Sequence, residues 1–495
     1  MAVSDSIISA EKIAGEEVHL EDLGHETFSD DVHDPLNWPT TQKLTVLAVL
    51  CVWMYVGTAN IVINGPAFPA ITQEFQISFT TASYLIAGSS LAYGSSSLIW
   101  VGVANRYGVR LTFVLCALAG GLVSIWGAKA TTFSNLLAAR IVASAFVASP
   151  EVLAPQVIGD VFHLKYRARA VTTLLVFEGV GFPMGPLIGA YIYSDHGWRW
   201  TEWIMVILLL ATAVLLFLFF PETQYTASTT ANKTKRTYID GLRFWRVSGG
   251  GTAKVHSLVS ALLYPFPYIL HPVVMMITFW GSVMVMVTNY VMTVSTFAFS
   301  QVYGFSVKAT GTSYVAPLIG ILVAVVVSGY MADWYEMRNL RMAAKSGVKP
   351  HPETRFVLLL ITGSIGVAGT ALFGACLGDK CHWIGAMAGS FGCLFSFVAG
   401  LSILYAYLMD VYEARTDAVL VMFNGIKNIA GFGITYAVFP WTAASGFTVP
   451  HVVLAMILLA AHLIVGAFYF IGPGVRKWTA AKFVTGRASK HGDTF

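Results

Sequence analysis

The sequence predicts an all-α membrane protein of twelve transmembrane helices, arranged as two pseudo-symmetric halves of six. Hydrophobic residues make up 56% of the 495 residues, charged residues only 11%, and the mean hydropathy is +0.67. An ordinary soluble domain carries about 25% charged residues. Apolar segments recur along the chain, and lysine and arginine are confined almost entirely to alternate loops. Together these observations exclude a soluble protein.

Each apolar segment is about 20 residues long, enough to cross a hydrocarbon core of about 30 Å. The segments are expected to be helices, because backbone groups in lipid must be hydrogen-bonded within their own segment. We place them at residues 43–64, 79–101, 111–128, 135–158, 170–193, 200–220, 271–299, 309–331, 355–376, 383–409, 417–440 and 451–471.

The basic residues predict the orientation. Of the 30 lysines and arginines, 24 fall in one set of alternating loops and tails, four in the other set, and two, Arg140 and Lys427, inside the segments. Lysine- and arginine-rich short loops stay cytoplasmic. Both termini are therefore expected in the cytoplasm of a multi-pass membrane protein.

A polar stretch of about 50 residues separates the sixth and seventh segments. It predicts a cytoplasmic loop at 221–270 between an N-terminal half at 43–220 and a C-terminal half at 271–472. The first 36 residues carry ten Asp or Glu, so residues 1–42 are expected to form a disordered tail. Residues 473–495 are expected to be a second cytoplasmic tail.

The two halves echo each other in sequence. Gly102-Val-Ala-Asn105-Arg106-Tyr-Gly108-Val-Arg110 follows the second segment, and Gly329-Tyr-Met-Ala-Asp333 follows the eighth. Asp160-Val-Phe follows the fourth segment and Asp410-Val-Tyr the tenth. Such internal repeats are typical of secondary transporters with a midplane site between the halves.

These motifs resemble those of a known family. The loop at 102–110 is similar to the G-x-x-x-D-R-x-G-x-R loop of the major facilitator superfamily. The stretch Gly181-Phe-Pro-Met-Gly185-Pro186-Leu-Ile-Gly189-Ala190 resembles the fifth-segment motif of its proton antiporters, and Arg140 stands where they carry an arginine. The stretches 34–39, 197–200, 221–223, 347–350 and 352–355 resemble the fungal twelve-span drug:proton antiporter branch, which includes polyamine and cation carriers.

Two positions depart from the family pattern. Asn105 replaces the loop aspartate, and Ala190 replaces the last glycine of the fifth-segment motif. In the family that aspartate helps to close the cytoplasmic side. Asparagine loses the charge–dipole contribution of about 0.3–1 kcal/mol at a helix terminus, so we expect a weaker gate in the N-terminal half. In the corresponding loop of the C-terminal half, Asp333 retains the acidic residue.

Four charged side chains are predicted near the middle of segments: Arg140, Glu151, Glu178 and Lys427. Ionisable residues inside a membrane are functional candidates by default. Burial disfavours an ionised carboxylate, so Glu178 is our first candidate for the proton-coupling acid and Glu151 the second, with Arg140 biasing their ionisation. The alternative is that one glutamate only pairs with Arg140 to hold the fourth and fifth segments together.

Lys427 belongs to a polar helical face that also contains Asn424, Asn428 and Gly431. The C-terminal half offers it no intramembrane acid, so it must reach across the centre, snorkel, lose its charge, or meet a substrate. A lysine that binds an anionic or carbonyl-bearing substrate is one interpretation. A lysine bonded to backbone carbonyls and neighbouring amides is the other.

Further substrate contacts are predicted from amides and aromatic rings. By resemblance, the first, fourth, seventh and tenth segments line the cavity, which makes Asn60, Asn64 and Asn289 candidate ligand contacts. Interhelical hydrogen bonding is an equally ordinary use for them. Aromatic candidates for the cavity wall are Tyr290, Phe177, Trp280 and Tyr405.

The fifth segment is predicted to act in gating. Gly181, Gly185 and Gly189 recur every four residues, which allows close helix approach, and Pro183 and Pro186 predict a bend. The alternative is plain close packing. The gating set is completed by the loop residues Gly102, Asn105, Arg106, Gly108, Arg110 and Asp333.

The most favoured function is therefore proton-coupled export of a small organic molecule, such as a drug, toxin or metabolite, by alternating access. The alternatives are proton-coupled uptake of a polyamine or other organic cation, and a solute sensor of transporter fold. Two acidic side chains inside the membrane favour a cationic solute. Two basic side chains, Arg140 and Lys427, in the same cavity argue against a strongly cationic solute.

We expect no enzymatic activity, because no metal-binding or catalytic cluster of His, Asp or Cys falls within the segments. No G-x-x-x-x-G-K-[ST] loop is present, so direct ATP use is not expected. We expect no cofactor, metal or nucleic-acid partner. The expected partners are a small-molecule substrate, protons and the lipid bilayer, for a monomer in the plasma membrane, with a vacuolar membrane as the alternative. Whether Cys376 and Cys381 pair is left open.

Overall fold

The computed structural model describes residues 34–224, 265–346, 351–412 and 416–484. Every regular element in these ranges is an α-helix or a short 3-10 helix. The predicted all-α fold is confirmed. Residues 1–33 of the predicted N-terminal tail and most of the central loop lie outside the described residues. The remainder of that predicted tail contains the 3-10 helix η2 (Pro35–Asn37) and the start of α2 (Thr40–Val62).

The N-terminal half contains six spans, two of which are divided. The first consists of α2 (Thr40–Val62), a 3-10 turn η3 (Gly65–Ala67) and α3 (Phe68–Phe75), and the fourth consists of two helices that meet at Ala148. The remaining helices are α4 (Phe79–Tyr107), α5 (Val109–Ala128), α6 (Phe133–Val147), α7 (Ser149–Val161), α8 (Leu164–His196) and α9 (Arg199–Phe219).

The C-terminal half repeats this arrangement. It contains α12 (Pro272–Tyr303), α13 (Val307–Ser313), α14 (Val315–Ser346), α15 (Phe356–Gly378), α16 (Trp383–Val411), α17 (Thr416–Ser445) and α18 (Thr448–Val484). Each predicted segment overlaps one span. The clearest difference is α18, which continues through Pro473 to Val484 where a tail was expected from residue 473.

Eleven spans among the described helices are long and apolar enough to cross a membrane. The twelfth expected segment corresponds to α4, which is long enough but rich in serine. Its serines bond to nearby carbonyls: Ser83 to Thr80 O at 2.7 Å and Ser97 to Gly94 O at 2.7 Å. A polar helix is tolerated there because hydroxyls such as these bond to carbonyls within the bundle.

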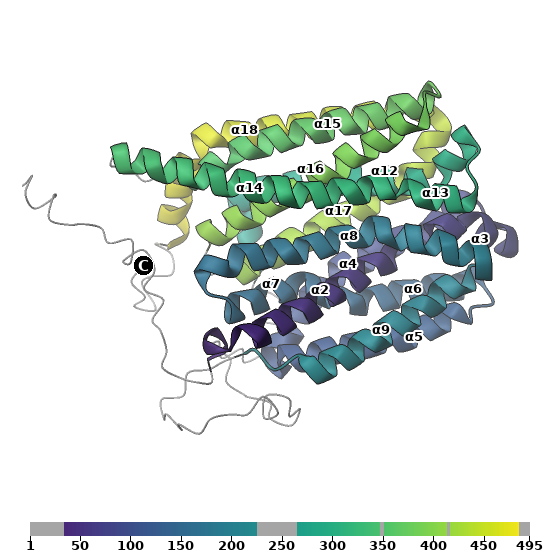
Figure 1. The fold of residues 1–495 in the computed structure, drawn as a ribbon, viewed down its shortest axis with the longest axis horizontal. Coiled ribbons are helices and arrows are strands. Elements are labelled where there is room, and N and C mark those ends of the chain that lie inside the picture. The colour runs from purple at the N-terminus through teal and green to yellow at the C-terminus, as the bar shows by residue number, and fades with distance from the viewer. Residues whose placement is uncertain (1–33, 225–264, 347–350, 413–415, 485–495) are drawn as a thin grey trace, which may run out of the picture.

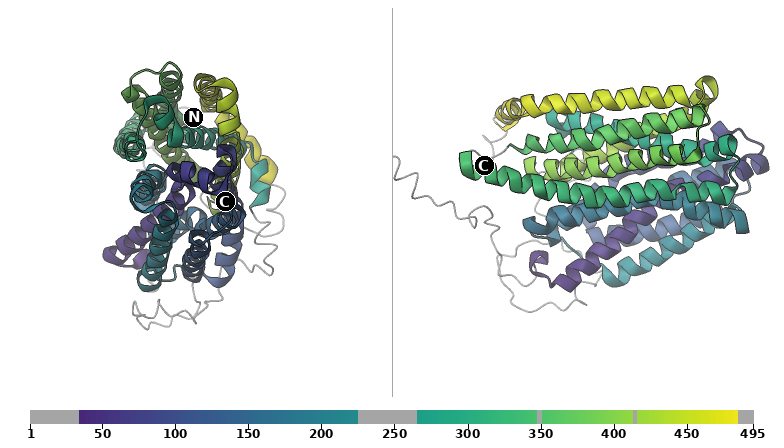
Figure 2. Two further views of the ribbon diagram at one scale, coloured as in Figure 1. Left: turned by 90° about the vertical axis from the view of Figure 1, so that its right-hand side faces the viewer. Right: turned by 45° about the horizontal axis from the view of Figure 1, so that its top comes forward.

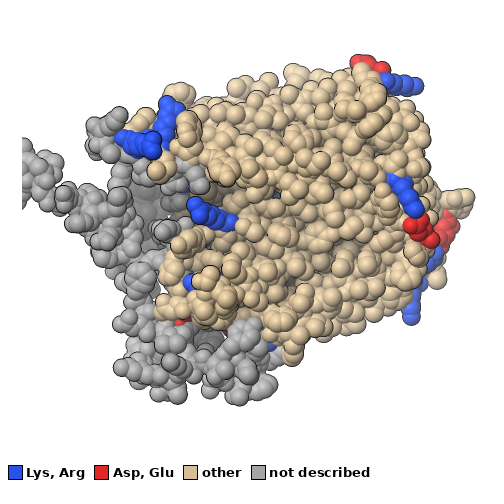
Figure 3. All heavy atoms as spheres, in the orientation of Figure 1, with Lys and Arg blue, Asp and Glu red and all other residues tan. Residues whose placement is uncertain are grey.

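The two halves lie side by side with their long helices roughly parallel. In Figure 1 the helices α2–α9 fill the lower part and α12–α18 the upper part. Figure 2 shows the two bundles end-on. On the face shown in Figure 3 the charged side chains gather near the two ends, with a broad uncharged belt between them. This distribution is typical of a protein with a lipid-facing middle.

The glycines of α8 face α2 within the same half. A Cβ atom at Gly181 would lie 1.9 Å from Thr58 Oγ1, and one at Gly189 would lie 2.2 Å from Ile63 O. Their immediate role is close helix packing, and the gating role of Gly181, Gly185, Gly189 and Pro186 stays a prediction. Ala190, which replaces the last glycine of the family motif, packs against Gly311 of the other half. A Cβ atom at Gly311 would lie 2.4 Å from the Ala190 Cβ.

The halves also meet at the end that we expect to face outward. Lys308 of α13 pairs with Asp195 of α8 at 2.6 Å. Between other helices of the two halves, Phe439 of α17 lies 6.4 Å from Phe68 and 6.0 Å from Phe79, centroid to centroid. These contacts join the two halves.

The packing of α8 on α2 gives a first prediction. Gly189→Ala should destabilise the protein by about 1–3 kcal/mol, because its Cβ would overlap a backbone carbonyl that cannot move without shifting α2. The control is Gly433→Ala, since a Cβ at Gly433 meets no atom within 4 Å and alanine favours helix by up to about 1 kcal/mol. Melting temperatures of the purified variants in detergent measure both. Equal melting temperatures would contradict the packing assignment.

Candidate functional site

The fourth span is divided at Ala148, ahead of Pro150. Proline has no N–H to donate to the carbonyl four residues earlier, that of Phe146, which accepts from the N–H of Ala148. The neighbouring carbonyl of Ala145 accepts hydrogen bonds from α4. Ser96 Oγ donates at 2.9 Å and Trp100 Nε1 at 2.6 Å. The broken helix is therefore stabilised by its neighbour, as irregular backbone at membrane depth requires.

The break places Glu151 in the first turn of α7. The N-terminus of a helix carries partial positive charge, which stabilises a carboxylate there. Glu151 is 1% exposed. A buried glutamate thus gains a backbone contribution that favours its ionised form.

Lys427 crosses from the C-terminal half to two glutamates of the N-terminal half. Its Nζ lies 2.9 Å from Glu151 Oε1 and 3.4 Å from Glu178 Oε1. The three side chains are at most 5% exposed. Asn428 Nδ2 donates to Glu151 Oε2 at 2.7 Å. We call Lys427, Glu151, Glu178 and Asn428 the central cluster.

Tyrosine and amide groups surround the central cluster. Asn424 Nδ2 donates to the backbone carbonyl of Glu151 at 3.3 Å, and Tyr405 OH donates to Asn424 Oδ1 at 2.6 Å. The Lys427 ammonium lies 5.6 Å from the centroid of the Phe423 ring. Tyr93 of α4 is 2% exposed and within electrostatic range of both glutamates. Its hydroxyl has no hydrogen-bond partner within the described part of the chain.

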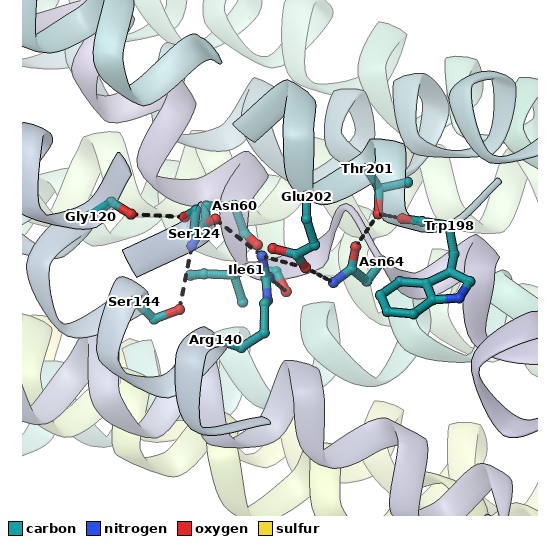
Figure 4. Close-up of polar contacts among 10 residues, drawn as sticks. All are labelled: Asn60, Ile61, Asn64, Gly120, Ser124, Arg140, Ser144, Trp198, Thr201 and Glu202. Carbon is teal, nitrogen blue, oxygen red and sulfur yellow. Dashed lines mark hydrogen bonds and ion pairs between the residues drawn. The ribbon is translucent and has the colours of Figure 1, made fainter. Parts of the chain in front are cut away.

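Arg140 belongs to a second network, inside the N-terminal half. Its Nη1 lies 3.6 Å from Glu202 Oε1, and it donates to Asn60 Oδ1 at 3.1 Å and to the backbone carbonyls of Asn60 and Ile61. Asn64 also donates to Glu202, and Thr201 Oγ1 donates to Asn64 Oδ1 at 2.6 Å. Figure 4 shows how these groups converge from α2, α6 and α9.

These two networks correct the expected pairing. We expected Arg140 to lie near Glu178 or Glu151, but the structure pairs it with Glu202 and pairs both expected acids with Lys427. Glu202 was missed because it stands in the first turn of α9, at the edge of the apolar segment. The sequence does show this acidic residue, three positions after Arg199, in a segment whose other residues are mostly apolar.

The predicted substrate contacts divide into three groups. Lys427, Asn424 and Asn428 share the central cluster, whereas Asn60 and Asn64 serve the Arg140 network. The remaining candidates lie elsewhere. Asn289 and Tyr290 of α12 pack against α17, near Gly431 and Thr442 respectively. Trp280 lies edge-on to His462 with ring centroids 5.4 Å apart, and Phe177 of α8 is 39% exposed.

The predicted loop gate holds an acid that was not assigned from the sequence. Glu222 reaches the N-terminus of α5, where Val109 N donates to it at 3.2 Å and Arg110 N at 3.1 Å. Gly108 allows this approach, since it has φ +97° and a Cβ there would lie 2.5 Å from Glu222 Oε2. Arg110 donates to Phe217 O at 2.7 Å. Burial raises the pKa of Glu222, and its backbone hydrogen bonds oppose that rise.

The other gating residues are less informative. Asn105 is partly buried and Arg106 is exposed, with its guanidinium 5.5 Å from the Tyr107 ring centroid. Gly102 is buried on α4. The side chain of Asp333 lies outside the described residues, so its role stays a prediction. The five cysteines are free thiols, and Cys376 and Cys381 are not bonded to each other.

Comparison with known proteins identifies a family. The model of the Major Facilitator Superfamily matches residues 46–435. An uncharacterised transporter of this type from Schizosaccharomyces pombe is 24% identical, over 92% of this chain and 88% of its own. A multidrug transporter of Candida glabrata is 24% identical over 91% of this chain and 78% of its own. An efflux pump of Floropilus chiversii is 23% identical over 83% of this chain and 76% of its own.

A solved structure supports the fold. The human organic anion transporter in its crystal structure superposes with a TM-score of 0.61 over 86% of this chain and all of that chain. The two sequences are 12% identical. At that identity the likeness extends to the fold alone.

The Arg140 network gives a second prediction. Glu202→Ala should destabilise the protein by about 3–5 kcal/mol, because it leaves a buried arginine without its counter-charge. The matched control is Asp195→Ala. Asp195 pairs with Lys308 at 2.6 Å, but the two side chains are 50% and 45% exposed, so its loss should cost about 0–1 kcal/mol. Detergent melting curves would show the difference, and equal losses would mean that the Arg140–Glu202 pair contributes no more than a surface pair.

Proposed function

The chain belongs to the major facilitator superfamily, and on that premise we propose that this transporter exchanges protons for a small organic solute. We propose further that it exports the solute across the plasma membrane. The observation that carries the proton-coupling proposal is the central cluster, with one ammonium and two carboxylates buried between the halves.

The charge of the cluster argues for one exchangeable proton. With both glutamates ionised and Lys427 charged, the cluster has a net charge of −1. A buried uncompensated charge is costly, and a titratable group neutralises in preference to bearing that cost. The closed cluster is therefore neutral when it holds one proton.

Glu178 is our proposed carrier of that proton. Three features favour the ionised form of Glu151: the closer ammonium, the Asn428 amide and the start of α7. Glu178 lies farther from Lys427, and its Oε2 is buried without a hydrogen-bond partner among the described residues. A carboxyl group with a free, buried oxygen is suited to gain and lose a proton.

Lys427 links this proton to movement of the halves. Its ammonium belongs to α17 of the C-terminal half, and both carboxylates belong to the N-terminal half. When water enters the interface from one side, the ion pairs are hydrated and weakened, and Glu178 exchanges its proton with that side. The Arg140–Glu202 pair joins only helices of the N-terminal half, so its proposed role is to keep that half rigid during the exchange.

The proposed direction rests on the relatives. The similar proteins include one named a multidrug transporter and one named an efflux pump. Export driven by a proton gradient fits a cell that keeps its exterior acidic relative to the cytoplasm. Cytoplasmic termini agree with the distribution of basic residues in the sequence. The plasma membrane is proposed from the resemblance to the fungal drug:proton antiporters.

The third prediction tests the carrier. In sealed proteoliposomes, Glu178→Gln should abolish proton movement coupled to solute flux yet leave solute exchange at equal pH partly intact, because glutamine keeps the shape and cannot titrate. The measurement pairs a trapped pH dye with uptake of ethidium, carboxyfluorescein and radiolabelled mannitol, which are a cation, an anion and a neutral solute. The matched control is Glu353→Gln, a glutamate that is also 1% exposed but contacts Tyr407 and Arg476.

Gradient-driven flux that persists in Glu178→Gln would reject Glu178 as the carrier and move the assignment to Glu151. Solute binding by the wild type with no flux of any probe would instead favour a sensor of transporter fold.

A further inference from the structure

The two carboxylates of the central cluster can neutralise two positive charges, and Lys427 supplies one of them. Glu151 is the nearer partner, at 2.9 Å against 3.4 Å for Glu178. Asn428 donates to the other oxygen of Glu151. One carboxylate is therefore already committed to the protein's own cation.

Glu178 offers the remaining charge to a ligand. Its Oε2 is buried with no hydrogen-bond partner in the described ranges, and the same holds for Tyr93 OH. Thr58 fixes the α8 backbone beside it by donating to the Glu178 carbonyl at 2.9 Å. The free oxygen of Glu178 is therefore a buried acceptor that no group of the described chain occupies.

The second basic residue of the membrane interior does not compete for this site. Arg140 is engaged by Glu202 and by the carbonyls of α2. Lys427 is the basic side chain that faces Glu178 among the contacts described. The two cations therefore belong to separate networks, and the charge of Arg140 is compensated by Glu202 and does not count against a cationic ligand at Glu178.

We propose that Lys427 sets the charge of the solute, so that the site accepts an organic monocation at Glu178 and rejects dications and anions. This inference rests on the proposed transport function and names its substrate class. With Lys427 kept by Glu151, a solute with one ammonium group replaces the coupling proton on Glu178 and leaves the cluster neutral. A second positive charge would have no carboxylate, and an anion would add a second uncompensated negative charge.

The surroundings agree with a carbon-rich amine. The ammonium position of Lys427 faces the Phe423 ring at 5.6 Å, and Tyr405 packs edge-on to the same ring with centroids 5.6 Å apart. Aromatic faces attract cations as well as apolar groups. The amides of Asn424 and Asn428 are engaged by the protein's own groups, so selectivity is assigned to charge.

The fourth prediction compares n-butylamine, 1,4-diaminobutane and butyrate, which share a four-carbon chain and differ in charge. At pH 8 both amines are protonated, because alkyl ammonium groups titrate near 10.4. Stabilisation of the purified wild type against heating reports binding. The monoamine should stabilise the wild type at concentrations about tenfold lower than the diamine, and butyrate should give no shift, since each extra charge goes uncompensated in a site of low dielectric.

The decisive variant is Lys427→Gln, which frees Glu151 for a second ammonium. In it the order should reverse, with the diamine effective at about tenfold lower concentration than the monoamine. An unchanged order in Lys427→Gln overturns the proposal. So does stabilisation of the wild type by butyrate or preferentially by the diamine, and so does the absence of a shift with either amine.

A second comparison keeps the test independent of the lysine variant, should that variant fail to fold. In Glu178→Gln the concentration of n-butylamine needed for stabilisation should rise about tenfold, whereas in Glu353→Gln it should not change. An unchanged concentration in Glu178→Gln overturns the site. These are binding measurements, so their failure alongside intact proton-coupled flux removes the solute class and leaves the transport function standing. Binding in the predicted order without proton-coupled flux would support the solute class and reject the transport function.

Discussion

The structure depends on the cost of placing charge inside a membrane. Each ionised side chain at that depth needs a partner, because neither water nor lipid supplies one. Arg140 and Lys427 meet this requirement in different ways. Arg140 is satisfied within one half by Glu202 and two backbone carbonyls, whereas Lys427 is satisfied only across the interface between the halves. The first arrangement joins helices of one half, and the second joins the two halves through groups that we propose respond to protonation.

Local backbone features place the groups that form the second arrangement. The interruption at Ala148 puts Glu151 at a helix start, and Ser96 and Trp100 of α4 donate hydrogen bonds to the carbonyl of Ala145 beside the interruption. Gly94 of α4 brings α17 close, since a Cβ there would lie 2.7 Å from the Asn428 Cβ. The position of Asn428, and with it the polar face of α17, follows from these two features. Helix breaks and glycines therefore determine the electrostatics of the central cluster.

Much of the fold could be predicted from the sequence, and the candidate site could be predicted in part. The twelve segments followed from length and hydropathy, which are local properties. The polar face of Lys427, Asn424 and Asn428 followed from helical periodicity. Its partners on α7 and α8 did not, because 249 residues separate Lys427 from Glu178 and 277 separate Asn428 from Glu151, and hydropathy carries no information about which helix faces which. Glu222 was likewise quoted only as part of a motif, although it reaches the start of α5.

The sequence by itself determined the class of protein, the number and place of its spans and the short inventory of charges in the membrane, because a bilayer imposes these constraints on every segment separately. Only the tertiary structure decided how those charges pair. Arg140 is the basic residue nearest to Glu151 in the sequence, yet it forms its ion pair with Glu202. Glu151 and Glu178 pair with Lys427 instead. The reason is geometric: a side chain reaches a few ångströms, so helix packing alone selects its counter-charge.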